Sequence, residues 1–263
     1  MNRQRALVTG ASGGIGLDIA RDLAAKGFDL VLTARSHDAL EHIAAELSSA
    51  HRIDAQVFPF DLARDDASRE LFDAVTAGGI VVDILINNAG FATYGPFAEG
   101  DIQTYLDLLH VNVVALTHLT KLFLPGMLRR RCGRILNVAS TAAFQPGPLM
   151  AVYYASKAFV LHFSEGVAEE VRGTGVTVTA LCPGATRTGF QKRGGLDDSS
   201  LFRGHVMESA AVARRGVDAM LRGQTLVIPG LRNQVLVALE RFSPRWLVTR
   251  IIRRMQAPVT SKS

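Results

Sequence analysis

Tyr153 and Lys157 are the two residues whose types and spacing most directly indicate chemistry. They lie four positions apart near the start of a predicted helix, so their side chains share one helix face. A tyrosine with a pKa near ~10 is a poor base at neutral pH until an adjacent positive charge stabilises its phenolate. Lys157 carries such a charge, so the pair predicts proton transfer to or from a reacting oxygen.

The tyrosine-lysine pair needs further support, because the same spacing occurs by chance on surface helices. Tyr154 is a competing choice, three positions from Lys157. Ser140 closes the predicted strand before the helix, thirteen residues ahead of Tyr153. Ligands bind at the carboxyl ends of parallel strands, so Ser140 and Tyr153 are predicted to meet at one site.

A glycine-rich turn follows the first predicted strand. Residues 9–16 read Thr-Gly-Ala-Ser-Gly-Gly-Ile-Gly and lead directly into a helix. Glycines allow close backbone approach to a diphosphate, and a helix N-terminus offers free N–H groups and positive partial charge. The alternative is a tight turn without a ligand. The cofactor-binding candidates here are Gly10, Ser12, Gly14, Ile15 and Gly16.

The end of the second predicted strand favours NADP(H) over NAD(H). An acidic residue at this place suits a free ribose 2′-hydroxyl, and a basic residue suits a 2′-phosphate. Here Ala34 stands at the expected acidic position and Arg35 follows it. The glycine turn adds no second basic residue, so a solvated arginine at a strand end remains the alternative interpretation.

Two more strand ends supply polar groups on the same edge of the sheet. Asp61 and Leu62 are placed to contact adenine, although Asp61 is also a suitable helix N-cap. Residues 87–90 provide amides and small side chains, and a simple Asn/Gly turn is the alternative. The candidates in this second group are Asn88, Ala89 and Gly90.

Apolar strand-like runs alternate with longer helical patterns along the chain. The runs are residues 5–8, 30–33, 56–60, 84–86, 134–138, 176–181 and 225–228, and the helices are 17–26, 39–47, 102–128 and 155–172. Uninterrupted apolar runs suit strands buried on both faces, and helices supply the crossovers of parallel strands. The prediction is an α/β fold with a doubly wound parallel sheet.

Length and composition are consistent with one catalytic domain. The chain has 263 residues, of which 48% are hydrophobic. We expect residues 1–229 to form a dinucleotide-binding domain, extended by a basic helical segment at 230–263. Cys132 and Cys182 form no disulfide or metal pattern, and no signal peptide or membrane-spanning run is found, so a cytoplasmic location without a metal site is predicted.

These motifs together resemble the short-chain dehydrogenase/reductase family in its compact, single-domain Rossmann form. Within it, the chain is similar to a bacterial branch distantly related to ketoacyl and steroid reductases. The resemblance covers about three quarters of the chain, and its motifs occur in family order. They are Thr9-Gly10-x-x-x-Gly14-x-Gly16, residues 87–90, Asn112, Ser140, Tyr153-x-x-x-Lys157 and Pro183-Gly184-x-x-x-Thr188.

The resemblance implies roles for the site residues. Tyr153 would be the general acid in reduction and the base in oxidation, with Lys157 lowering its pKa and holding the nicotinamide ribose. Ser140 would bind the substrate oxygen, and Asn112 would hold a water that relays protons to Lys157. Thr188 would bind the nicotinamide carboxamide. The resemblance adds Pro183, Gly184 and Thr186 to the cofactor site, and implies a homo-oligomer.

A lipophilic ketone, aldehyde or alcohol is the expected substrate, because apolar residues flank the predicted chemistry. Packing inside the protein is the alternative role for these residues, and residues 189–209 are expected to form a substrate lid. The flanking residues are Phe91, Tyr94, Phe144, Leu149, Met150, Phe190, Leu196, Leu201 and Phe202.

The C-terminal segment concentrates the positive charge of the chain. Residues 230–263 hold six arginines and one lysine against one glutamate, whereas the rest is nearly balanced. Such a local charge argues against a nucleic-acid partner. Two short amphipathic helices separated by Ser243-Pro244 are predicted. Two interpretations remain open, a peripheral membrane contact or a hairpin packed over the cleft or a partner subunit.

Two other functions are weighed against the oxidoreductase. One is a catalytically idle NADP-binding interaction protein on the same fold, because a fold does not fix a function. The complete set of Asn112, Ser140, Tyr153 and Lys157 argues against it. The other is a sugar epimerase, which usually carries a larger C-terminal domain. His110 and His118 are expected to have packing or surface roles.

Overall fold

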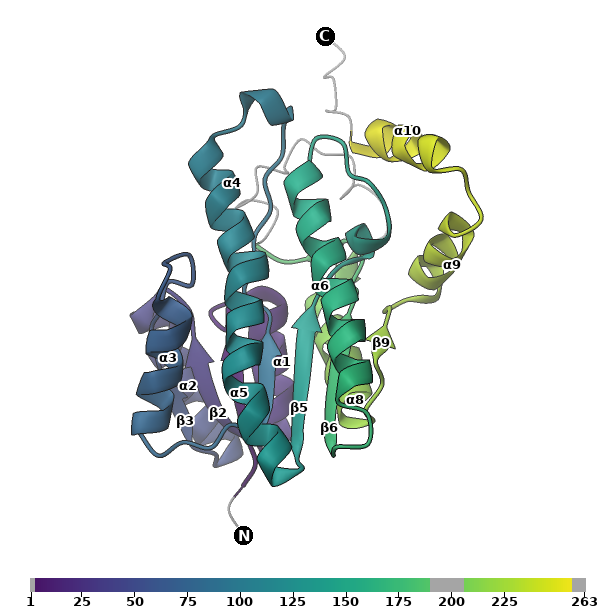
Figure 1. The fold of residues 1–263 in the computed structure, drawn as a ribbon. Helices are drawn as coiled ribbons and strands as arrows, with labels where there is room; N and C mark the ends of the chain where they lie inside the picture. The colour runs from purple at the N-terminus through teal and green to yellow at the C-terminus, as the bar shows by residue number, and fades with distance from the viewer. Residues whose placement is uncertain (1–2, 190–205, 257–263) are drawn as a thin grey trace.

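A parallel sheet of seven strands forms the centre of the protein, which we describe from a computed structural model covering residues 3–189 and 206–256. Its strand order is β3-β2-β1-β4-β5-β6-β9, and every neighbouring pair is parallel (Figure 1). The strands are β1 (Arg5–Thr9), β2 (Asp29–Thr33), β3 (Ala55–Val57), β4 (Ile84–Asn87), β5 (Gly133–Val138), β6 (Val176–Leu181) and β9 (Leu226–Val227). The predicted doubly wound sheet is confirmed.

Helices cover both faces of this sheet, which explains the uninterrupted apolar strands. Leu7 in β1 packs toward α3 (Ala67–Ala77) and α5 (Leu116–Arg130), whereas its neighbour Val8 packs toward the opposite layer. That layer contains α1 (Gly14–Ala25), α2 (His37–His51) and α8 (Ser209–Leu221). Successive strand residues point to opposite faces, so each must be apolar when both faces are buried.

The helix α6 (Ala151–Glu170) carries Tyr153 and Lys157 and packs beside β5 and β6. In Figure 1 it stands in the same layer as α5 and α3, in front of the sheet. This layer brings the start of α6 to the carboxyl ends of the strands, where β5 delivers Ser140.

A long helical segment runs from α4 (Ile102–Leu109) through a π-helical stretch, η2 (His110–Ala115), into α5. The π turn contains Asn112, and such turns are frequent at functional sites. Among the described residues, this segment, Ile102–Arg130, is long and apolar enough by composition to cross a membrane. Leu119, Phe123 and Met127 of the same helix pack into the core against the sheet.

The sequence missed α3 and α8, and the predicted loop at 189–209 is partly wrong. Met207–Glu208 forms a short strand, β8, parallel to β7 (Thr186–Arg187), and α8 begins at Ser209. Two-residue strands carry too little pattern to be read from a sequence. Residues 190–205 of the proposed lid lie outside the described part of the chain.

Two helices follow the last strand, as predicted. They are α9 (Leu231–Glu240) and α10 (Arg245–Gln256), and we call residues 231–256 the arm. Figure 1 shows the arm leaving the sheet beyond β9 and extending past the carboxyl ends of the strands. It adds no strand to the seven-stranded sheet.

Candidate active site

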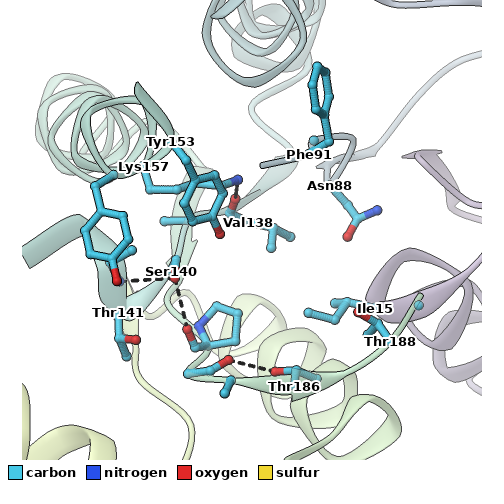
Figure 2. A pocket seen from close by; sticks show the side chains of 18 of the residues that line it. Ile15, Asn88, Phe91, Val138, Ser140, Thr141, Tyr153, Lys157, Thr186 and Thr188 are labelled. Atoms are coloured by element: carbon cyan, nitrogen blue, oxygen red, sulfur yellow. Dashed lines mark hydrogen bonds between the residues drawn. The ribbon is translucent and has the colours of Figure 1, made fainter. Parts of the chain in front are cut away.

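A cavity of about 1200 Å³ lies where the strands β1, β2, β4, β5 and β6 end. The glycine turn and the β2 end line one part of it, and the start of α6 lines another. Figure 2 shows Ser140, Tyr153 and Lys157 on one side of the pocket, with Ile15 and Thr188 on the other. Groups that are far apart in sequence therefore face one space.

Almost all of the predicted site residues line this cavity. Two do not: Gly16 lies under the glycine turn, and Asn112 lies behind Gly90. The lining residues are Gly10, Ser12, Gly14, Ile15, Arg35, Asp61, Leu62, Asn88, Ala89, Gly90, Ser140, Tyr153, Lys157, Pro183, Gly184, Thr186 and Thr188.

The glycine turn needs its glycines for two separate reasons. Gly10 and Gly14 have φ angles of +65° and +60°, a conformation that side chains disfavour. Gly16 is required for space, because a Cβ there would collide with the Asn88 amide and the Gly10 carbonyl. Gly13, by contrast, has nothing within 4 Å of its Cβ position. The turn thus presents its backbone to open space at the N-terminus of α1.

Thr9 and Asn88 tie the glycine turn to the β4 end. The Thr9 hydroxyl accepts hydrogen bonds from the backbone N–H groups of Asn88 and Ala89, at 2.9 and 3.0 Å. Asn88 Nδ2 donates in return to the carbonyls of Thr9 and Gly10, at 2.9 and 3.2 Å. Sequence reasoning gave Thr9 no role, although its position beside Gly10 was a usable signal.

Arg35 and Asp61 lie at the cavity end formed by β2 and β3. Arg35 is exposed and lines the cavity together with Ala34 and Ser36 at the end of β2. Asp61 Oδ1 accepts from the Ala63 N–H at 3.1 Å in a turn before α3, while its residue still lines the cavity. The capping and ligand-binding interpretations of Asp61 are thus compatible.

Ser140 and Tyr153 meet directly, which singles out Tyr153 over its neighbour. The Ser140 hydroxyl hydrogen-bonds the Tyr153 side chain and also donates to the Pro183 carbonyl at 3.4 Å. Burial raises the pKa of Tyr153 to about 12, and the Ser140 contact partly opposes that rise. The expected lowering of this pKa by Lys157 is not found, because burial and the Ser140 contact account for the shift, so the tyrosine is a protonated donor at neutral pH.

Lys157 is buried beneath Tyr153. Its Nζ donates to the Val138 carbonyl at 2.8 Å and lies 5.8 Å from the centre of the Tyr153 ring. Burial disfavours its ammonium form and lowers its pKa to about 8. The lysine is therefore still charged at neutral pH, although its charge is lost far earlier than in an exposed lysine.

Asn112 links the long helix to the β4 end and to α6. Its Oδ1 accepts from the Phe91 N–H at 3.1 Å, and its Nδ2 donates to the Phe91 carbonyl and to Ser156 Oγ, both at 3.0 Å. A Cβ on Gly90 would lie 2.9 Å from Asn112 Oδ1 and 3.5 Å from Lys157 Nζ. The backbone of Gly90 therefore lies close to both Asn112 Oδ1 and Lys157 Nζ.

The segment after β6 closes the cavity over the glycine turn. The Thr188 side chain lies beside Gly14, 3.2 Å from the place of a Cβ. Thr186 Oγ1 donates to the Gly184 carbonyl at 2.9 Å. Gly184 itself packs against Asn233 of α9, where a side chain would be blocked at 2.6 Å. This contact joins the arm to the cavity.

The arm supplies much of the remaining lining, which agrees with the interpretation of a hairpin packed over the cleft that the sequence left open. Met150 from the predicted apolar set also lines the cavity, whereas Phe144 packs in the core and Tyr94 faces a smaller neighbouring cavity. The amphipathic spacing predicted the two arm helices, but it did not predict which side of each helix faces the cavity. The arm residues that line the cavity are Arg232, Asn233, Leu236, Val237, Leu239, Glu240, Ser243, Val248, Ile251, Ile252 and Met255.

One end of the cavity fits a dinucleotide cofactor. The glycine turn offers an open backbone at a helix N-terminus, and Arg35 and Asp61 stand at the adenosine end. At Gly90, a Cβ would be too close to Asn112 Oδ1, at 2.9 Å. The described residues contain no group of three or more histidine, cysteine, aspartate or glutamate side chains that could hold a metal ion.

The family model for short chain dehydrogenases matches residues 4–198. That range contains every predicted site residue, from Gly10 to Thr188.

Several curated relatives are very-long-chain 3-oxoacyl-CoA reductases. The duck protein (Anas platyrhynchos) is 34% identical over 193 residues, which cover 71% of this chain and 61% of the relative. The human protein is 30% identical over 258 residues, covering 95% of this chain and 78% of the relative. For the cattle protein (Bos taurus), the match spans 58% of the relative's length.

Solved structures with the same fold match nearly the whole length of this chain. A short-chain dehydrogenase from Sphingobium yanoikuyae in complex with NADPH is 31% identical, has a TM-score of 0.82 and covers 98% of this chain and 100% of its own. The bulky-bulky ketone specific alcohol dehydrogenase from Comamonas testosteroni is 26% identical, with a TM-score of 0.79 and coverages of 100% and 98%.

Proposed function

The chain belongs to the short-chain dehydrogenase family, and we propose that it is an NADP(H)-dependent oxidoreductase interconverting a lipophilic ketone or aldehyde and its alcohol. The observation that carries this proposal is the convergence of Ser140, Tyr153 and Lys157 on the cavity that also contains the glycine turn. A proton donor and a dinucleotide cradle in one space are what carbonyl reduction requires.

Residues from several strand ends would hold the cofactor, which supplies or accepts a hydride when bound. The turn at Gly10–Gly14 would bind the diphosphate through backbone N–H groups. Arg35 would pair with the 2′-phosphate, since Ala34 presents no competing carboxylate. Asp61 would contact adenine. The structural relative solved in complex with NADPH supports the same preference.

Tyr153 would give its proton to the substrate oxygen during reduction and remove it during oxidation. Its raised pKa keeps the phenol protonated at neutral pH, which suits the reductive direction. Ser140, already bonded to Tyr153, would hold the same substrate oxygen. The two hydroxyls therefore define the point at which the carbonyl oxygen would bind.

Lys157 and Asn112 would restore the proton of Tyr153 and hold the nicotinamide ribose. Lys157 Nζ is fixed by the Val138 carbonyl and lies on the side of Gly90 that faces Asn112. The π turn places Asn112 where its side chain binds both carbonyl and N–H of Phe91. A water beside these groups would connect the lysine to solvent.

Apolar side chains at the other end of the cavity favour a lipophilic substrate. Met150, Val248 and Ile252 are buried in one cluster with Tyr153. The names of the relatives point to long 3-oxoacyl thioesters and to bulky ketones. We propose that substrates of these two chemical classes enter along the arm.

The proposal is tested with a panel of 3-oxoacyl thioesters and bulky aryl ketones, following NADPH oxidation by absorbance. We expect turnover with apolar carbonyl compounds, and turnover at least about 100-fold slower with the Tyr153→Phe variant used as control. NADPH binding without turnover of any carbonyl or alcohol would contradict the enzymatic proposal and favour an idle cofactor-binding protein.

A further inference from the structure

The arm has an outward apolar row that the cavity does not use. Leu231, Val235 and Phe242 follow helical spacing along and just after α9, and they are 75%, 48% and 89% exposed. None of the three lines the cavity. Single exposed apolar side chains are ordinary, but a row on one helix face marks a contact surface.

The orientation of α10 is fixed by its inner face. Val248, Ile252 and Gln256 recur every four residues and are buried, and Gln256 Nε2 donates to the Tyr154 hydroxyl at 2.6 Å. The opposite face is therefore turned to solvent. It carries Trp246, which is 61% exposed, with the Arg250 guanidinium 5.2 Å from the centre of its ring.

The same arm is strongly basic. It contains six arginines, all exposed, and a single acidic residue, Glu240, which lies within electrostatic range of Arg245. Within residues 3–189 and 206–256, none of the six forms an ion pair with a carboxylate. The six are Arg232, Arg241, Arg245, Arg250, Arg253 and Arg254.

We propose that the outward face of the arm docks on an anionic lipid surface. The apolar row of α9 and the indole of Trp246 would enter the headgroup region, and the arginines beside them would bind lipid phosphates. An apolar face with tryptophan and flanking arginines has the composition of interfacial helices. Each arginine near an anionic surface adds attraction that weakens with salt.

The positive charge of the arm favours an anionic lipid surface over a second copy of the chain as the binding partner. A two-fold interface through the arm would place the same patch on both sides and bring the two sets of arginines together. Like charges face each other in that arrangement, whereas an anionic surface is complementary to every one of them. The observed charge therefore favours lipid over self-association.

The docking face adjoins the mouth of the cavity. Leu239, Ile251 and Met255 line the cavity and are still 59%, 46% and 45% exposed, so they stand at its rim. A lipophilic substrate dissolved in the bilayer would meet this rim directly. This part of the inference rests on the proposed function, whereas lipid docking itself does not.

The fluorescence emission of Trp246 reports directly on lipid contact, because Trp246 is the only tryptophan in the chain. The full-length protein is mixed with vesicles of phosphatidylcholine alone or with phosphatidylglycerol added, at low and high salt. We expect flotation and a blue-shifted Trp246 emission with the anionic vesicles at low salt, both lost at high salt. Brominated lipids should quench the emission.

Matched variants distinguish the contribution of the arginines to vesicle binding from that of the apolar side chains. Arg250→Gln with Arg254→Gln should weaken vesicle binding by at least about tenfold, and Leu231→Ser with Phe242→Ser should abolish the blue shift. The controls are Arg69→Gln with Arg129→Gln, and Val81→Ser, an exposed apolar site 52% accessible outside the arm. The controls should bind like the parent protein.

Four results would overturn the proposal. They are unchanged Trp246 emission with anionic vesicles, binding that ignores lipid charge, control variants that lose binding equally, and a lipid-free dimer that already buries Trp246. The dimer would be seen as a doubled mass in light scattering with a blue-shifted emission. Reductase activity is measured on the same samples, so a failure of lipid docking is distinguishable from a failure of the proposed chemistry.

Discussion

The side-chain amide of Gln256 donates a 2.6 Å hydrogen bond to the hydroxyl of Tyr154, joining the last turn of α10 to the helix that carries Tyr153. The Tyr94 hydroxyl donates to the backbone carbonyl of the same glutamine. Gln256 is fully buried at this junction. Tyr154, a rival for the proton-donor role in the sequence, instead anchors the arm.

Tyr154→Phe should loosen α10 without removing the proton donor. The change leaves the buried Gln256 Nε2 without its tyrosine acceptor, at a cost of about 1–3 kcal/mol. We expect amide hydrogen exchange in α10 to accelerate by about tenfold. Tyr105→Phe, at a buried tyrosine outside the arm, is the control. Equal protection in the parent and Tyr154→Phe would show that this bond does not hold the arm.

Tyr153→Phe should reduce kcat by at least about 100-fold, because it removes the proposed general acid. The dissociation constant for NADPH, measured by fluorescence titration, should change little. Tyr154→Phe should lose far less activity. Equal losses in the two variants, or the reverse order, would refute the assignment of Tyr153.

Arg35 should determine cofactor choice. We expect kcat/KM with NADPH to exceed that with NADH by at least about tenfold, which corresponds to ~1.4 kcal/mol. Arg35→Asp should reverse the order, since a carboxylate repels the 2′-phosphate and can accept from a free 2′-hydroxyl. Arg21→Gln, on α1, serves as the control. Comparable parent efficiencies with both cofactors would rule out the proposed preference.

The rate of reduction should fall as the pH rises through about 8. Burial lowers the pKa of Lys157 to about 8, so its ammonium is lost there instead of near 10.5. Tyr153, with a pKa of about 12, stays protonated over this range and cannot cause the decline. The check is kcat/KM against pH. A value of kcat/KM that stays constant up to pH 10.5 would contradict this role of Lys157.

Glu240 should make the KM for an uncharged substrate depend on pH around its own pKa. It lines the cavity, and burial raises its pKa to about 7. Below that pH the carboxyl is neutral, so an uncharged lipophilic ketone should show a lower KM. Glu240→Gln should remove the dependence, and Asp107→Asn, also in the cavity lining, should retain it. A KM that is constant from pH 6 to 8 (about one unit either side of the pKa) would count against this role.

Local patterns were sufficient for the sheet and for most of the candidate site. Residues 6–8 of β1 and 84–86 of β4 are apolar without a break because both sheet faces are covered, and that pattern needs no tertiary information. Gly10 and Tyr153 could be proposed from the sequence because each belongs to a motif with fixed local spacing. The sheet then brings them to the same cavity.

Contacts between distant segments were not predictable in the same way. The bond between Gln256 and Tyr154 joins residues 102 positions apart, and no local signal marks either partner. The sequence predicted one continuous helix over 102–128, and the π turn around Asn112 within it was not predicted. β7 and β8 exist only through their pairing with each other.

The arm has a consequence for how this protein can diversify. It follows the last strand and forms no part of the parallel ladder, yet it supplies a large share of the cavity lining. Exchange of residues 231–256 for those of a homologue would therefore alter substrate range while leaving the dinucleotide cradle and the proton donor in place. Chimeras joined at Gly230, directly before α9, are therefore the natural way to exchange this part of the cavity wall.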